Sequence, residues 1–234
     1  MGVQNGTSIL NISDPANLSE VAFIPGATSL WKDIKTYKHH AYVVNESGGG
    51  LQIIDLSNLP NNATHVNTYI GFSTSHNIHI DEANAMLYAE GGPSEPVRAL
   101  SLVDPVNPVQ VSACGIECHD IYIRDNIVYV SEGSSGSIGI FDLSNPTSPA
   151  FLARINIPNG GYVHNSWLSD DGNYLMSTEE TSGKTIKLWD IHDLNQITLT
   201  DEYLGSSGLV HNAHIKGDYA YISHYADGLR VVDI

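Results

Sequence analysis

Basic residues are scarce in this sequence. The 234 residues include 10 Lys and Arg against 26 Asp and Glu, so the formal net charge is −16. Binding to nucleic acid relies on clustered Lys and Arg side chains that contact phosphates. The composition therefore predicts that nucleic acid is not a partner of this chain.

Long apolar stretches and charged residues are also few. No segment approaches the roughly 20 consecutive apolar residues of a transmembrane helix, so no membrane span is expected. Residues 1–6 have neither the basic region nor the apolar region of a signal peptide, although a cleaved signal peptide would leave the same trace. Only 15% of the residues are charged and 41% are hydrophobic, a composition that favours a folded chain over a disordered one.

Histidine, by contrast, is abundant, and it marks an internal repeat. The 11 His outnumber Lys and Arg together. Similar segments begin at Lys32, His76, His119, His164 and His211, with starts 43 to 47 residues apart. Each continues as a short alternating strand, a turn rich in Asp, Asn and Gly, a strand centred on Tyr, and an apolar strand that ends in Asp. A Pro/Asn turn and a fourth strand follow, as expected for antiparallel sheet.

Four short strands in about 45 residues, repeated along a chain, are typical of a β-propeller blade. One four-stranded sheet cannot bury both of its faces, whereas blades packed face to face can. We therefore expect an all-β fold, a single β-propeller domain over residues 1–234. A β-sandwich is the alternative, but sandwiches rarely repeat residue by residue. The expected units are 7–28 (partial), 29–72, 73–115, 116–160, 161–207 and 208–234 (partial), which fit either a fragment of a larger propeller or a small closed one.

The apolar strands resemble the LVIVD repeat, most clearly at 229–233 and in copies at 51–55, 138–142 and 186–190. The segments 29–37, 164–172, 211–214 and 223–230 resemble blades of the propeller family called choice-of-anchor B. This resemblance implies an extracellular, cell-surface or periplasmic location. Together with the acidic composition, it favours a binding module whose partner is a protein or a glycan.

The repeated histidines predict a site on the propeller axis. In a propeller the first strand of each blade lines the central channel, so His76, His119, His164 and His211 should lie at one end of it. The second strand returns to the same end, where Glu46, Glu90, Glu132 and Glu179 stand behind the histidines. Neutral imidazole binds Cu, Zn, Fe or Ni, and a ligating His usually donates its other N–H to a carboxylate. We therefore predict one transition-metal site, with His79, His214 and His224 as secondary candidates.

Other interpretations of the same residues stay open. The histidines, with the Asp or Asn that follows each of them, can instead hold neighbouring blades or turns together, or bind a small anion. If a metal is bound, the chain is either a binding module or a metal-dependent enzyme of redox or hydrolytic type, and the sequence does not choose between them.

The two cysteines, Cys114 and Cys118, stand beside His119. A disulfide between them is plausible in an exported protein. Cys118 as a soft metal ligand and a pair of free thiols are the alternatives.

Overall fold

The computed structural model describes residues 1–90, 97–114, 116 and 118–234, without the side chain of Cys114. It divides into two compact units, Met1–Ile116 and Glu117–Ile234. The described residues form antiparallel sheets and one short 3-10 turn, η1 (Tyr225–Asp227), with no α-helix. Among them, no helix is long and apolar enough to cross a membrane. The prediction of an all-β propeller fold is confirmed, and the single-domain boundary stays a prediction.

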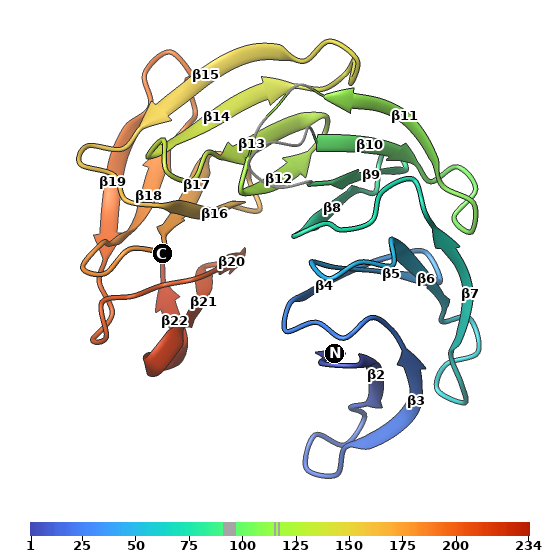
Figure 1. The fold of residues 1–234 in the computed structure, drawn as a ribbon. Helices are drawn as coiled ribbons and strands as arrows, with labels where there is room; N and C mark the ends of the chain where they lie inside the picture. Colours follow the sequence, from blue (N-terminus) through green and yellow to red (C-terminus); the bar gives the residue numbers. More distant parts are fainter. Residues whose placement is uncertain (91–96, 115, 117) are drawn as a thin grey trace. The chain divides into compact units, whose positions relative to one another are not determined.

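The first unit contains three sheets, each made from consecutive strands (Figure 1). Its four-stranded sheets fall within the predicted repeats 29–72 and 73–115. The partial unit at the start begins earlier than the predicted residue 7, because Gly2 and Val3 form a strand that pairs with Thr7 and Gly6. The strands are β1 (Gly2–Val3), β2 (Gly6–Asn11), β3 (Ser19–Pro25); β4 (Lys32–Tyr37), β5 (His40–Asn45), β6 (Leu51–Asp55), β7 (Thr64–Tyr69); and β8 (Ile78–Asp81), β9 (Met86–Ala89), β10 (Val97–Ser101), β11 (Val109–Cys114).

The second unit also contains three consecutive sheets (Figure 1). Two have four strands and the last has three, as the repeat pattern predicted. The strands are β12 (Asp120–Arg124), β13 (Ile127–Ser131), β14 (Ser137–Asp142), β15 (Ala150–Asn156); β16 (Val163–Leu168), β17 (Tyr174–Glu179), β18 (Ile186–Asp190), β19 (Thr198–Tyr203); and β20 (Ala213–Lys216), β21 (Tyr219–His224), β22 (Gly228–Asp233).

Neighbouring sheets of one unit pack through apolar faces. In the first unit, Tyr42, Leu51, Ile53, Leu87 and Leu100 are fully buried in one cluster shared by the second and third sheets. In the second unit, one apolar cluster joins the sheet that contains β16 to the sheet before it, and a second cluster joins it to the sheet after it. The first strands of successive sheets lie beside one another, β12 next to β16 and β16 next to β20. Residues at the start of each first strand are thereby gathered at neighbouring positions.

A bulge recurs where the third strand of a blade pairs with the fourth. In five sheets the register shifts at this point, and the fourth strand contributes one extra residue. The extra residues are Val21, Val66, Val111, Leu152 and Thr200. A bulge bends its strand and increases the local twist, so the outer strand of each blade bends at the same place.

Buried polar side chains tie neighbouring sheets together. Asn165 of β16 donates to Asp120 Oδ2 of the preceding sheet (2.8 Å) and accepts from the backbone N–H of Ala213 in the following one (3.1 Å). In the first unit, Asp33 Oδ2 accepts from the Ile78 N–H at 2.9 Å. The Asp or Asn that follows the repeated His or Lys therefore bonds the next sheet at these positions, rather than forming a turn.

Buried tyrosines should make the fold sensitive to high pH. Tyr42 is fully buried and donates to the Pro105 carbonyl at 2.9 Å. Burial raises the pKa of Tyr42, and likewise the pKa values of Tyr122 and Tyr129. Their contribution to stability is complete below the ordinary tyrosine pKa of about 10 and is lost as the pH rises through the higher native values.

We therefore expect the urea midpoint to fall steadily above pH ~10, while tyrosinate absorbance at those pH values rises together with unfolding. Tyr42→Phe should flatten this pH dependence, and Tyr219→Phe, at an exposed position, should leave it unchanged. A midpoint that stays constant up to pH ~11 would contradict the assignment.

Candidate metal centre

Three of the repeated histidines lie in a row in the second unit. His119 precedes β12, His164 is the second residue of β16, and His211 precedes β20. The ring centroids of His119 and His164 are 4.3 Å apart, and those of His164 and His211 are 3.9 Å apart. The structure thus brings together the three first-strand histidines that lie in this unit.

A bulge directs His164 into the row. In the ladder between β16 and β17, Val163 pairs with Glu179 and Asn165 with Thr178, so His164 has no opposite residue. The side chain of His164 is only 1% exposed. Bulges often re-aim a side chain next to an active site, and here the bulge lets His164 and Asn165 serve different neighbours.

Backbone contacts fix the other two histidines. The N–H groups of His119 and His211 donate to the carbonyls of Ser131 and Ser223, each at 2.9 Å. Thr178 Oγ1 of the preceding sheet donates to the His211 carbonyl at 2.6 Å. The backbone of both histidines is therefore held by hydrogen bonds within its own sheet. The backbone of His211 is also bonded to the neighbouring sheet.

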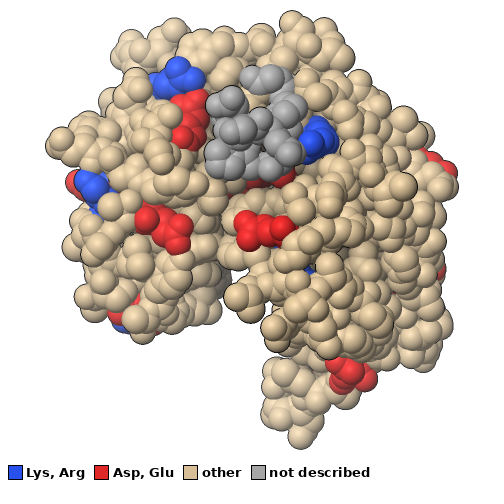
Figure 2. All heavy atoms as spheres, viewed as in Figure 1, with Lys and Arg blue, Asp and Glu red and all other residues tan. Residues whose placement is uncertain are grey.

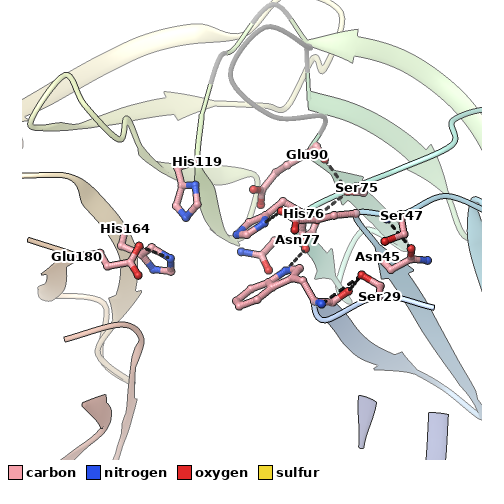
Figure 3. A network of polar contacts seen from close by, with 12 residues as sticks. Ser29, Asn45, Ser47, Ser75, His76, Asn77, Glu90, His119, His164 and Glu180 are labelled. Carbon is pink, nitrogen blue, oxygen red and sulfur yellow. Dashed lines mark hydrogen bonds and ion pairs between the residues drawn. The ribbon is translucent and has the colours of Figure 1, made fainter. Parts of the chain in front are cut away.

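Glu180 supplies a carboxylate to the row. One of its oxygens lies 3.7 Å from His164 Nε2, and Figure 3 shows the Glu180 side chain beside His164. The Glu180 N–H donates to the Tyr162 carbonyl at 2.7 Å. Ligand atoms of His164, His211 and Glu180 all lie within 4.8 Å of one another, so two imidazoles and one carboxylate converge.

Two tyrosines flank the row. Tyr162 Oη lies 2.9 Å from His119 Nδ1. At the other end, Tyr225 packs edge-on against His211, with ring centroids 5.5 Å apart, and its hydroxyl donates to Glu180 Oε1. Burial first, and then the Glu180 carboxylate, raise the pKa of Tyr225 to about 12. Its hydroxyl is therefore protonated and able to donate at neutral pH.

Two of the predicted outer carboxylates bind basic side chains. Glu179 is fully buried and contacts Lys187 Nζ and the Gly161 N–H, each at 2.5 Å. Glu132 forms a bidentate pair with Arg154 at 2.9 and 2.7 Å. In this unit, Glu180 approaches the histidines instead. The sequence pattern places Glu179, with Glu180 beside it, at the end of this strand, and the predicted role was assigned to Glu179.

In the first unit, His76 contacts Glu46, one of the carboxylates named from the sequence. Its Nδ1 lies 2.6 Å from Glu46 Oε1, its ring stacks on Trp31 at 4.5 Å, and Trp31 Nε1 donates to its carbonyl. Glu90 is fully buried, and its backbone bonds Asn77 and Ser75 (Figure 3). A His–carboxylate pair of this kind holds the imidazole in one orientation.

The secondary candidates His79, His214 and His224 lie in β8, β20 and β21. His214 packs on Trp167 with ring centroids 4.0 Å apart. His224 is buried, with Nδ1 3.0 Å from Ser207 Oγ and 3.3 Å from Asp227. His79 is half-buried in β8. Cys118 is buried, but the Cys114 side chain is outside the described residues, so the Cys114–Cys118 disulfide stays a prediction.

The donor set can bind a transition metal. Metal–ligand bonds of about 2.0–2.2 Å place neighbouring donors roughly 3–3.5 Å apart, so the 3.7 Å between His164 and Glu180 is close to a loaded geometry. Among the described residues, no Lys or Arg lies within ion-pair distance of Glu180. Its negative charge is therefore available to a cation.

On the face that Figure 2 shows, the Lys and Arg side chains of the described residues lie singly rather than in a patch. The exclusion of nucleic acid remains a prediction from composition.

Comparison with protein families finds LVIVD repeats at residues 31–68, 117–156 and 207–234. These matches confirm the repeat that the sequence resembles, and the narrower choice-of-anchor B assignment stays a prediction. No curated protein matches the chain.

Solved structures resemble the fold at low sequence identity. A chain of a mitotic checkpoint complex is 13% identical with a TM-score of 0.70, over 92% of this chain and 65% of that one. A chain of a nidogen/laminin complex is 11% identical with a TM-score of 0.67, over 98% and 87%. A candidate 6-phosphogluconolactonase from Bacteroides uniformis is 17% identical with a TM-score of 0.69, over 97% and 73%. The chain thus spans just under two thirds of the first of these, and the likeness shows the fold alone.

Proposed function

Because LVIVD repeats occur in both units of this β-propeller, we propose that the chain is an extracellular binding module that holds one transition-metal ion. The metal ligands are His164, His211 and Glu180. The observation that carries this proposal is the convergence of their ligand atoms within 4.8 Å. Two imidazoles with a carboxylate suit Zn, Fe or Cu better than Mg or Ca, which prefer oxygen donors alone.

The surroundings support the same assignment. His164 is almost completely buried, so its orientation is fixed before a metal arrives. Glu180 is held through its backbone and through Tyr225. Preorganised ligands lose little conformational freedom on binding, which favours a stable complex.

The proposal is tested by metal binding to the full chain. After loading with Zn(II) or Cu(II), we expect about one bound equivalent of the added ion by plasma mass spectrometry, as for a single three-ligand site. His164→Ala and Glu180→Gln should each weaken binding in calorimetry by more than the about 10- to 100-fold that the loss of an outer hydrogen-bond partner costs. His192→Ala, an exposed histidine outside the row, is the matched control and should bind like the parent chain.

A second readout is thermal stability. At a free metal concentration of 100 times Kd, binding to the native state alone adds about 2.7 kcal/mol. This should raise Tm by about 5–10 °C in a domain of this size, and Glu180→Gln should abolish the rise. Equal binding by all variants, or no bound metal in the parent chain, would overturn the proposal.

A metal-dependent enzyme is the second candidate. It is favoured by the number of protein ligands, since three leave coordination positions open for water or substrate, as in catalytic zinc sites. Zn-loaded chain should then hydrolyse an activated ester or phosphate, or Cu-loaded chain should consume oxygen with a reductant, and Glu180→Gln should abolish either activity. Absence of both activities would leave the binding module alone.

The partner that we propose is a protein. Two of the structural neighbours are chains of protein complexes, and propellers offer loops at the ends of many strands for such contacts. The extracellular location rests on the resemblance to surface-attached propellers. Cell fractionation and cross-linking of the full-length gene product test the location and partner together, and binding to a glycan array instead of a protein would replace this partner.

A further inference from the structure

We propose that Tyr225 is a fourth ligand of this centre, binding as a phenolate, and that the ion selected is therefore ferric iron. This inference rests on the proposed metal site at His164, His211 and Glu180. It adds a ligand type, an oxidation state and an optical signature that the three-ligand site alone would lack.

The contacts of Tyr225 carry the inference. Its ring lies edge-on against His211, with an interplanar angle of 88°, and its hydroxyl reaches Glu180 Oε1. Tyr225 thus touches two of the three proposed ligands. The other Glu180 oxygen lies 3.7 Å from His164 Nε2, so one carboxylate links the Tyr225 hydroxyl to His164.

The backbone at Tyr225 supports a functional role. Tyr225 has φ of 30°, in the left-handed region that side chains rarely adopt, at the start of η1. Strained backbone of this kind persists where surrounding contacts enforce it, and it clusters at functional sites. Although about half of the side chain is exposed, its hydroxyl is held at the carboxylate.

Phenolate and carboxylate are hard, anionic oxygen donors. With two neutral imidazoles they provide two negative charges, which a trivalent ion matches better than a soft or monovalent one. On binding, the Tyr225 O–H bond breaks, its proton passes to bulk water, and an oxygen–iron bond forms. No electron is transferred, so the step needs no oxidant when iron is supplied as Fe(III).

Tyr162 provides an internal comparison. Its hydroxyl lies 2.9 Å from His119 Nδ1, and His119 is outside the set formed by His164, Glu180 and His211. Tyr162 is therefore expected to stay a neutral phenol. The two tyrosines flank the same row, but the hydroxyl of Tyr162 is bonded to His119, whereas the hydroxyl of Tyr225 is bonded to the proposed ligand Glu180.

The test is optical titration of the full chain with ferric nitrilotriacetate, beside calorimetry with Zn(II). We expect a visible phenolate-to-iron charge-transfer band in the parent chain and in Tyr162→Phe, and its loss in Tyr225→Phe. Zn(II) binding by Tyr225→Phe should weaken by no more than the about 10- to 100-fold that an outer partner contributes, which also shows that this variant is folded.

The outcomes separate the two proposals. If Zn(II) binds with the expected dependence on Glu180 but Fe(III) gives no visible band, the three-ligand site stands and the phenolate inference is overturned. A band that persists in Tyr225→Phe overturns it equally. If neither Zn(II) nor Fe(III) binds, the proposed metal site itself is wrong.

Discussion

Replacing Lys187 by Met should destabilise the protein by about 3–5 kcal/mol, because it leaves the Glu179 carboxylate buried without its counter-ion. Glu179 is fully buried and the Lys187 side chain is 10% exposed. Lys187 also donates to Thr185 Oγ1 at 2.9 Å, and Glu179 accepts from the Gly161 N–H. The pair therefore connects β17, β18 and the loop before β16.

Urea unfolding of Lys187→Met is the measurement. The matched control is Lys216→Met, since Lys216 forms an exposed pair with Asp170 at 3.7 Å and such pairs contribute about 0–1 kcal/mol. Lys187→Met combined with Glu179→Gln should recover part of the loss, because the uncompensated charge is removed while an acceptor for Gly161 remains. A loss below about 1 kcal/mol in the single variant would show that the Glu179 charge is hydrated.

The Glu179–Lys187 ion pair also distinguishes the roles of Glu179 and Glu180. We expect the Lys187 variant to lose stability while keeping its metal affinity, and Glu180→Gln to lose metal affinity while keeping most of its stability. The reverse result would return Glu179 to the role predicted from the sequence, that of a carboxylate standing behind the histidines.

Asn165→Ala should destabilise the protein by about 2–4 kcal/mol. Asn165 is 5% exposed, and its amide serves Asp120 in one sheet and the Ala213 N–H in another. Each buried partner left without its bond costs about 1–3 kcal/mol. In a domain of this size the loss corresponds to a fall in Tm of about 5–15 °C.

The control is Asn195→Ala, in an exposed turn where the amide bonds only Asp193 among the described contacts. It should change Tm by less than about 3 °C, as for surface substitutions. If both Asn variants melt alike, the contacts of Asn165 do not hold the sheets together in solution.

The sequence predicts the periodic features of this protein well. Alternating apolar strands and turn residues are local signals, so the blades around Tyr42 and Tyr129 are found within their predicted units. The row formed by His119, His164 and His211 follows from the same periodicity, because equivalent positions of neighbouring blades lie side by side.

The finer features of the site depend on contacts that no local pattern encodes. The bulge at His164 changes the register by one residue, and with it the neighbours of Asn165. Glu180 faces the histidines because Glu179 is committed to Lys187, a contact between two strands. Asp and Asn are common turn residues, but the hydrogen-bond partners of Asp33 and Asn165 lie one repeat further along the chain.

The recurring bulge in the outer strand has an evolutionary consequence. Residues of a strand alternate between the two faces of the sheet. An unmatched residue such as Val66 or Leu152 therefore exchanges the faces to which all later side chains of that strand point. Duplication of a whole blade copies this inversion intact and keeps each side chain on its proper face. Deletion of that single residue would turn apolar side chains toward water. Gain or loss of whole repeats should therefore preserve the fold far better than insertion or deletion of single residues within the outer strands.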